Sequence, residues 1–164
     1  MRIAAVFLIA VVPLSGCGRS ASSFDPEDPE VIAQIESQLQ SAMAGAAAAD
    51  AGRVLAIAAG QNDLTFITGD VMLSGLETIR ASFEDTYAEV AKQDQTIREK
   101  RVRLISPDVA LVMAVGEGTY TDKASWTSQP VGIGLTIVFV REDGTWRACH
   151  AHQSIAFPIR PEGE

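Results

Sequence analysis

The sequence predicts an α+β domain in which three helices cover a strongly curved antiparallel sheet that encloses a pocket. Helical periodicity dominates up to about residue 90, broken only by two short strand-like segments. Four long strand-like segments then fill residues 95 to 157. Two of these long strands contain glycines, which usually mark bulges or bends in a sheet that curls: Gly116, Gly118, Gly132 and Gly134.

Two helices are predicted in the first part of the domain. Asp28 is a favourable N-cap and Pro29 suits the first helical position. Asp50 can cap a second, shorter helix that ends before the Gly60–Asp63 segment. Apolar residues recur at helical spacing along the first helix: Val31, Ile32, Ile35, Leu39, Ala42 and Met43.

A short hairpin and a third helix follow. Strands are predicted over 64–67 and 71–73, joined by a turn at Thr68-Gly69-Asp70. Ser74-Gly75-Leu76-Glu77 has the pattern of a capping box, which predicts a helix start at this point. The apolar face of this helix consists of Leu76, Ile79, Phe83, Tyr87 and Val90.

The long strands are predicted over 95–105, 109–120, 131–140 and 145–157, with a hairpin turn at Asp143-Gly144. Strand alternation assigns side chains to faces. On the last strand it groups Trp146, Ala148, His150, His152 and Ser154 on one face, with Cys149 on the other. On the second strand it groups Glu117 with Leu111, Met113, Val115 and Thr119.

The first residues have the composition of a secretory leader. Met1-Arg2 is basic, Ile3–Leu14 is apolar but too short to span a bilayer, and small residues precede Cys17. Leu14-Ser15-Gly16-Cys17 resembles the lipobox of bacterial lipoproteins, which implies acylation of Cys17. The alternatives are an ordinary cleaved signal with an incidental cysteine, or an uncleaved anchor. The expected organisation is a signal peptide (1–16), a lipidated tether (17–27), one domain (28–158) and a tail (159–164).

Charge and cysteine content limit the possible partners. The sequence has 13 Lys and Arg residues, and cleavage of the leader would remove Arg2. The mature chain would then carry 12 basic and 21 acidic residues, a net charge of −9. This balance disfavours nucleic acid, so the lipid anchor is the expected membrane contact. Gly18, rather than aspartate, follows Cys17, which favours the outer membrane of the cell envelope if the organism has one. Cys149 alone remains after the leader, so no internal disulfide can form.

The order of elements and two segments resemble the SnoaL-like branch of the nuclear transport factor 2-like superfamily. The segments are the helix start 75–80 and the final strand 144–154, which reads GTWRACHAHQS. The resemblance implies a cone-shaped fold with a pocket and an outer sheet face that often forms homodimers. Members include isomerases, cyclases, hydrolases and dehydratases as well as non-catalytic binding modules, so the fold leaves function open.

Three residues are candidate catalytic groups. His150 and His152 lie two apart on one strand, so their side chains point the same way. Glu117 lies in an otherwise apolar strand, where burial would raise the pKa of a carboxylate. The histidine spacing can also hold a metal, with Glu117 as a third ligand. The family resemblance favours pocket-lining or structural histidines, so we expect neither metal nor cofactor.

The remaining candidates are ligand-binding residues: Tyr87, Met113, Trp126 and Thr136. Tyr87 equally suits a core position, and Trp126 either covers the pocket entrance or packs on the sheet edge. The first expectation is a non-catalytic envelope module that binds a small apolar or amphipathic molecule or acts as a dimeric interaction module. The alternative is a cofactor-independent isomerase, cyclase or lyase that uses His150, His152 or Glu117.

Acylation of Cys17 is directly testable. We expect the wild-type protein to incorporate a labelled palmitate analogue in growing cells, and the Cys17→Ala protein to lose that label because the acceptor thiol is gone. Gel fluorescence at matched protein levels measures the difference. Equal labelling of the two proteins would disprove the assignment.

Overall fold

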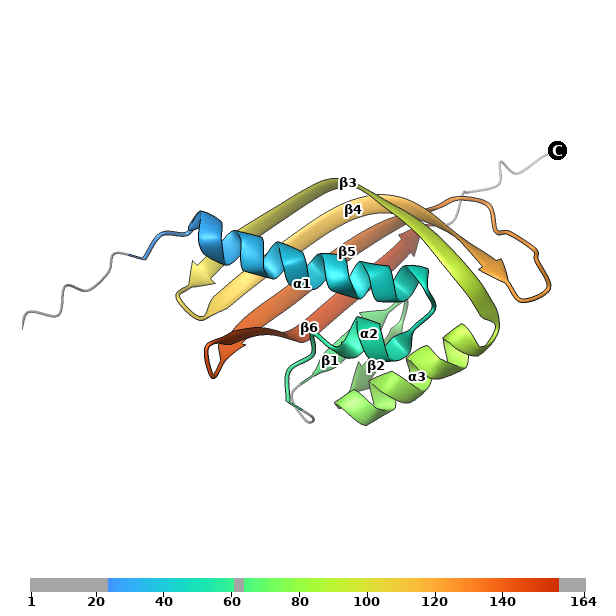
Figure 1. Cartoon of the computed structure of the whole chain (residues 1–164), viewed down its shortest axis with the longest axis horizontal. Coiled ribbons are helices and arrows are strands. Elements are labelled where there is room, and N and C mark those ends of the chain that lie inside the picture. Colours follow the sequence, from blue (N-terminus) through green and yellow to red (C-terminus); the bar gives the residue numbers. More distant parts are fainter. Residues whose placement is uncertain (1–23, 61–63, 157–164) are drawn as a thin grey trace, which may run out of the picture.

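A computed structural model of the chain describes residues 24–60 and 64–156 (Figure 1). The predicted leader, Cys17 and the tail 159–164 lie outside the described residues. The elements are α1 Pro29–Ala47, α2 Ala51–Leu55, β1 Thr65–Thr68, β2 Val71–Ser74, α3 Leu76–Ala88, β3 Val90–Ser106, β4 Val109–Asp122, β5 Val131–Glu142 and β6 Thr145–Ala156. The predicted α+β class is confirmed.

The starts of α1 and α2 are stabilised as the sequence predicts. The Asp28 carboxylate accepts hydrogen bonds from the backbone N–H groups of Glu30 (2.9 Å) and Val31 (3.3 Å). The Asp50 carboxylate accepts one from the N–H of Arg53 at 3.0 Å. Each bond satisfies a backbone donor that has no partner within its helix.

The predicted capping box at the start of α3 is wrong. The helix begins at Leu76, and its N-cap is Gly75, which makes no side-chain hydrogen bond. Ser74 instead belongs to β2, where it is paired with Thr65 of β1. Gly75 turns the chain from β2 into the helix with a φ of 85°, a left-handed conformation that glycine adopts without steric cost.

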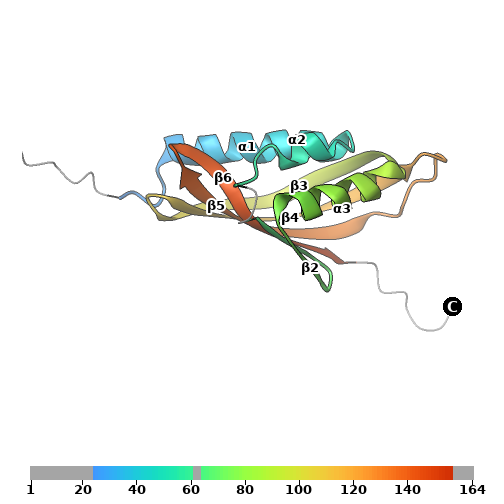
Figure 2. The same ribbon diagram turned by 90° about the horizontal axis from the view of Figure 1, so that it is seen from below.

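The sheet has six strands in the order β2-β1-β6-β5-β4-β3. All neighbours are antiparallel except β1 and β6, which are parallel. The helices lie together on one side of this sheet (Figures 1 and 2). We call the sheet surface toward the helices the inner face and the opposite surface the outer face.

The inner face is closely packed. Phe139 of β5 is 0% exposed and Trp146 of β6 is 2% exposed. They join one core cluster that extends from α1 across the sheet: Ile35, Leu39, Ala42, Ile57, Leu104, Ala110, Val112, Ile137, Phe139, Trp146 and Ala148. Large side chains therefore fill the space between α1 and the first half of β6.

One extra residue in β6 separates Trp146 and Ala148 from the histidines. Ala148 pairs with Phe139, but the next pair is His150 with Val138, so Cys149 is the extra residue of a β-bulge. The alternation of side chains shifts by one at this point. Trp146 and Ala148 are buried on the inner face, whereas His150 and His152 lie on the outer face. The predicted common face for these residues is therefore wrong.

The edge strand β3 carries three register shifts against β4, after Val90, Ile97 and Leu104. Such bulges bend a strand and disrupt the regular edge that could pair with another chain. The middle shift lies opposite Gly116, where a Cβ atom would overlap the carbonyl oxygen of Thr96. Glycine in β4 thus accompanies a bend, as predicted, but the bulge is in the neighbouring strand.

The last residues of the predicted tether contact the domain. The backbone N–H of Leu104 in β3 donates to the carbonyl of Pro26 at 3.2 Å. Among the described residues, no helix has the length and apolar character needed to cross a bilayer.

A pair of matched glycine substitutions tests the close approach of β3 and β4. Gly116→Ala should lower the free energy of unfolding by about 1–3 kcal/mol, because the new methyl group is overpacked against the Thr96 backbone. In Gly132→Ala the nearest atom to the new methyl is the Ala156 Cβ at 3.5 Å, an ordinary contact. We expect that variant to be unchanged or stabilised by about 0.4–1 kcal/mol. Urea denaturation measures both, and equal losses would contradict the packing argument.

Candidate functional site

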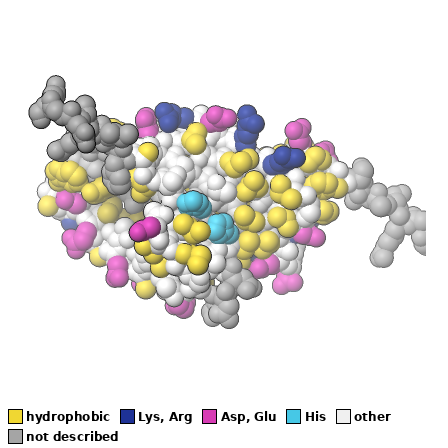
Figure 3. Space-filling model, turned by 180° about the vertical axis from the view of Figure 1, so that it is seen from behind, with side chains coloured by type: hydrophobic (Ala, Val, Ile, Leu, Met, Phe, Trp, Pro, Cys, Tyr) yellow, Lys and Arg dark blue, Asp and Glu magenta, His cyan; other side chains and the backbone are white. Residues whose placement is uncertain are grey.

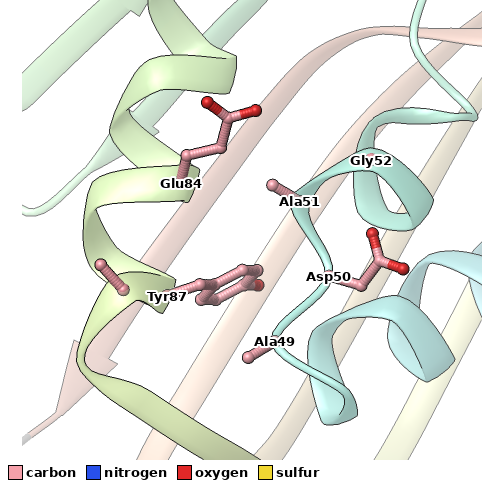
Figure 4. A pocket seen from close by; sticks show the side chains of 7 residues that line it. Ala49, Asp50, Ala51, Gly52, Glu84 and Tyr87 are labelled. Atoms are coloured by element: carbon pink, nitrogen blue, oxygen red, sulfur yellow. The ribbon is translucent and has the colours of Figure 1, made fainter.

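A hollow of about 410 Å³ lies between the start of α2 and the end of α3. It is lined by Ala49, Asp50, Ala51, Gly52, Glu84, Tyr87 and Ala88. All these residues come from helices or from the α1–α2 connection, so the hollow is separate from the sheet (Figure 4). Its walls are alanines, and its polar groups are one phenol and two carboxylates.

Tyr87 is the most enclosed polar side chain of this hollow. It is 9% exposed, and its ring meets Phe83 edge-on with the centroids 5.7 Å apart. The side chain extends from α3 across to the α1–α2 connection (Figure 4), and no hydrogen bond links its hydroxyl to any described residue. Burial raises the pKa of Tyr87 from 10.0 to about 12 because the charged phenolate is poorly solvated there. The group is therefore a neutral phenol at physiological pH.

The two carboxylates differ in their environment. Asp50 turns toward α2, whose first turn it caps through the Arg53 N–H. Glu84 is exposed and lies one helical turn before Tyr87, so the two side chains share one side of α3 and reach toward α2 (Figure 4). Neither carboxylate belongs to an ion pair among the described residues.

A second hollow of about 360 Å³ lies between α1 and β3. Its lining includes Leu39, Met43 and Ile97. A salt bridge of 2.7 Å between Lys100 of β3 and Glu36 of α1 links its two sides. This pair places Lys100 on the helix side of the strand.

The histidines lie on the outer face. The hydroxyl of Thr65 in β1 is hydrogen-bonded to Nδ1 of His150 at 2.7 Å, which orients the imidazole ring. His150 is half-buried and His152 is exposed. Their neighbours in register are Thr65 and Ile67 of β1 and Val138 and Thr136 of β5. Figure 3 shows the histidines near the middle of this face with hydrophobic side chains around them.

Glu117 also lies on the outer face but far from the histidines. It pairs with Gly132, whereas His152 pairs with Thr136, two strands away from β4 and four residues along. This register separates their Cα atoms by roughly 16 Å. Glu117 is exposed. In the described part of the chain, no three His, Cys, Asp or Glu side chains are grouped as metal ligands.

Three of the four predicted ligand-binding residues lie outside the hollows. Met113 and Thr136 are paired between β4 and β5 on the outer face. Trp126 is 55% exposed in the β4–β5 connection, where its ring meets that of Tyr120 edge-on. Tyr87 alone of the four lines a hollow.

The apolar residues expected to line one pocket are divided between two faces. Leu111, Met113 and Val115 alternate with buried residues of β4 and therefore lie outside, whereas Ile137 and Phe139 belong to the core. Cys149 is half-buried, and its thiol donates to the carbonyl of Val138 at 3.5 Å.

Glu84, which lines the hollow beside Tyr87, was not predicted as a site residue. Their i, i+3 spacing on an amphipathic helix could have indicated a shared side. The position of the α1–α2 connection beside α3 could not have been predicted, because it depends on the close packing of Gly45 in α1 against α2. A Cβ at Gly45 would lie 2.7 Å from the backbone nitrogen of Val54.

The burial of Tyr87 predicts its titration. In a Tyr120→Phe protein Tyr87 is the only tyrosine, so phenolate absorbance at alkaline pH reports on it alone. We expect a midpoint near 12 in the folded protein and near 10 in urea. The folded state then holds its phenol proton above pH 10 while the unfolded state releases it. Stability should therefore fall as the pH rises from 10 to 12, and Tyr87→Phe should reduce this fall. A folded midpoint near 10 would contradict the burial of the Tyr87 side chain.

Known proteins resemble this chain in sequence and in structure. The SnoaL-like domain family matches residues 35–158. No curated protein has a significantly similar sequence. A nuclear transport factor 2-like superfamily protein from Salmonella enterica is 16% identical with a TM-score of 0.70, and the match covers 82% of this chain and 98% of that one.

Two further structures extend the comparison. A ketosteroid isomerase-like protein from Erwinia carotovora is 22% identical with a TM-score of 0.67, over 79% of this chain and 99% of that one. A putative calcium/calmodulin dependent protein kinase II association domain from Xanthomonas campestris is 26% identical with a TM-score of 0.63, over 82% and 91%. The fold and the family match agree, and the chain belongs to the SnoaL-like domain family of the nuclear transport factor 2-like superfamily.

Proposed function

We propose that this protein is a lipid-anchored, non-catalytic module of the cell envelope that pairs with a second copy of itself through the outer face of its sheet. The observation that carries the proposal is the apolar character of this exposed face. Met113 is 37% exposed, Val115 is 47% exposed and Met72 of β2 is 68% exposed. Large exposed apolar areas usually mark interaction sites.

The size of the outer face suits a dimer. Four strands at a spacing of ~4.8 Å, each with about ten residues at ~3.3 Å, cover roughly 600 Å². Two such faces would bury about 1,200 Å² together, at the lower end of the range for specific interfaces. A symmetric pair needs one self-complementary patch, and the exposed apolar side chains of β2 and β4 on this face (Met72, Met113 and Val115) could supply its centre. One structural relative is described as an association domain, which also supports this role.

The membrane part of the proposal rests on the sequence alone. The leader and Cys17 have the order of features found in bacterial lipoproteins. With Cys17 acylated, the domain would face the envelope solution on a short tether.

The packed interior favours pairing over ligand binding beneath the sheet. Phe139 and Trp146 are buried in the core cluster between α1 and the sheet in this half of the domain. Both hollows instead lie at the surface, beside the helices.

An isomerase, cyclase or lyase remains the alternative, and the ketosteroid isomerase-like relative shows that the fold accommodates proteins so described. Such chemistry requires two titratable groups that reach one substrate. His152 and Glu117 are separated by two strands, and neither lines a hollow. This separation makes the alternative the weaker proposal.

A charged residue on the outer face should prevent pairing. We expect Val115→Glu to weaken self-association at least about 100-fold, because an unpaired charge buried in an apolar interface costs several kcal/mol. The control is Ser41→Glu, which adds the same charge at an exposed position of α1. Sedimentation of the full-length proteins in density-matched detergent measures the dimer fraction. A wild type that is monomeric at all concentrations, or equal effects of both substitutions, would overturn the proposal.

A further inference from the structure

We infer that the hollow between α2 and α3 is a binding site for a small organic cation, an amine whose ammonium group meets Glu84 and the hydroxyl of Tyr87 while its apolar part rests on the alanine walls. This site is independent of the outer face. It also differs from a pocket enclosed by the sheet, since no strand residue contributes to its lining.

Tyr87 supplies the neutral polar group of this hollow. The side chain is nine-tenths buried, and no hydrogen bond joins its hydroxyl to a described residue. Among the described residues, the hydroxyl is not one of the fully buried polar atoms without a partner, so it is open to the hollow, where a ligand or solvent can supply a hydrogen bond. Tyr87 lines the hollow, and Figure 4 shows its side chain extending across it.

The charged side chains that line the hollow are all negative. Two carboxylates line the hollow, and no Lys or Arg does. The nearest basic residues along the two helices are Arg53 and Arg80, and neither forms a salt bridge with a lining carboxylate. Glu84 therefore has no cationic partner among the described residues.

The position at the end of α3 adds to this negative potential. Glu84, Tyr87 and Ala88 belong to the last turns of a 13-residue helix. The free carbonyl groups of a helix C-terminus carry a partial negative charge, which favours cations. The last turn of α3 contains no basic residue that would neutralise it. An anion placed here would be repelled by Asp50, by Glu84 and by the C-terminus of α3.

The walls determine the rest of the ligand. Ala49, Ala51 and Ala88 present only methyl groups. The hollow, about 410 Å³ in volume and widely open to solvent, is wide enough to seat a small molecule. A primary ammonium offers three donors, enough to reach the Glu84 carboxylate and the phenol oxygen together. A compact amine with an apolar body satisfies both the polar and the apolar parts of the site.

A matched series of three compounds tests the inference. We would titrate 2-phenylethylamine, its neutral analogue 2-phenylethanol and the anionic 3-phenylpropionate into isotope-labelled full-length protein at neutral pH and follow the backbone amide resonances. The amine should bind saturably with a Kd on the order of 1 mM and shift amides of residues 49–52 and 84–88. The neutral compound should bind more weakly and the anion not at all.

Single substitutions locate the binding groups. Glu84→Gln should raise the Kd of the amine about three- to fivefold, the range of an exposed ion pair. Tyr87→Phe should raise it about two- to tenfold, the range of one hydrogen bond. The control is Asp85→Asn, which removes the same charge from an exposed residue of α3 that does not line the hollow; it should change the Kd less than twofold.

Three results would overturn the inference. Equal binding of the amine and the alcohol would show that charge is irrelevant. Preferential binding of the anion would show that the sign is wrong. Amide shifts outside residues 49–52 and 84–88, or equal effects of Glu84→Gln and Asp85→Asn, would place the amine elsewhere.

Discussion

The single extra residue in β6 determines which side chains the sheet presents to the helices and which to its outer face. Before the bulge, Trp146 and Ala148 face the helices and complete the core. After it, even-numbered residues of β6 point to the outer face instead of the inner face. His150 and His152 therefore lie on the outer face, beside Val138 and Thr136 of β5. The bulge thereby lets one strand contribute large side chains to the core at its start and oriented histidines to the opposite surface at its end.

Much of the fold could be predicted from the sequence because its signals are local. Asp28, Asp50 and the Asp143-Gly144 turn act through bonds and dihedral angles within a few residues. Asp143 and Gly144 indeed adopt φ values of 48° and 79°, as a tight hairpin turn requires. The capping box failed for the opposite reason, since Ser74 pairs with Thr65 of a strand nine residues earlier in the chain.

The candidate site was harder to predict because it depends on long-range register and packing. Strand alternation correctly grouped Leu111, Met113 and Val115 on one face of β4, where no extra residue interrupts the pattern. It misplaced the histidines relative to Trp146, since nothing in Ala148-Cys149-His150 indicates a bulge. Tyr87 was predicted as a ligand-binding residue, with a core position as the alternative. Its ring is buried and its side chain lines a hollow outside the sheet, and ligand binding by Tyr87 stays a prediction.

The two proposed surfaces are compatible because they occupy opposite sides of the molecule. The outer face lies behind the sheet, whereas the Tyr87 hollow lies among the helices on the other side (Figures 1 and 2). Pairing through the sheet would therefore leave the hollow open to solvent on both copies. Anchoring through Cys17 would strengthen the pairing without new contacts, because tethering confines the partners and raises their effective concentration. An interface at the lower end of the usual size range could then suffice on a membrane, and the free energy needed for association would come partly from the anchor rather than from the sheet.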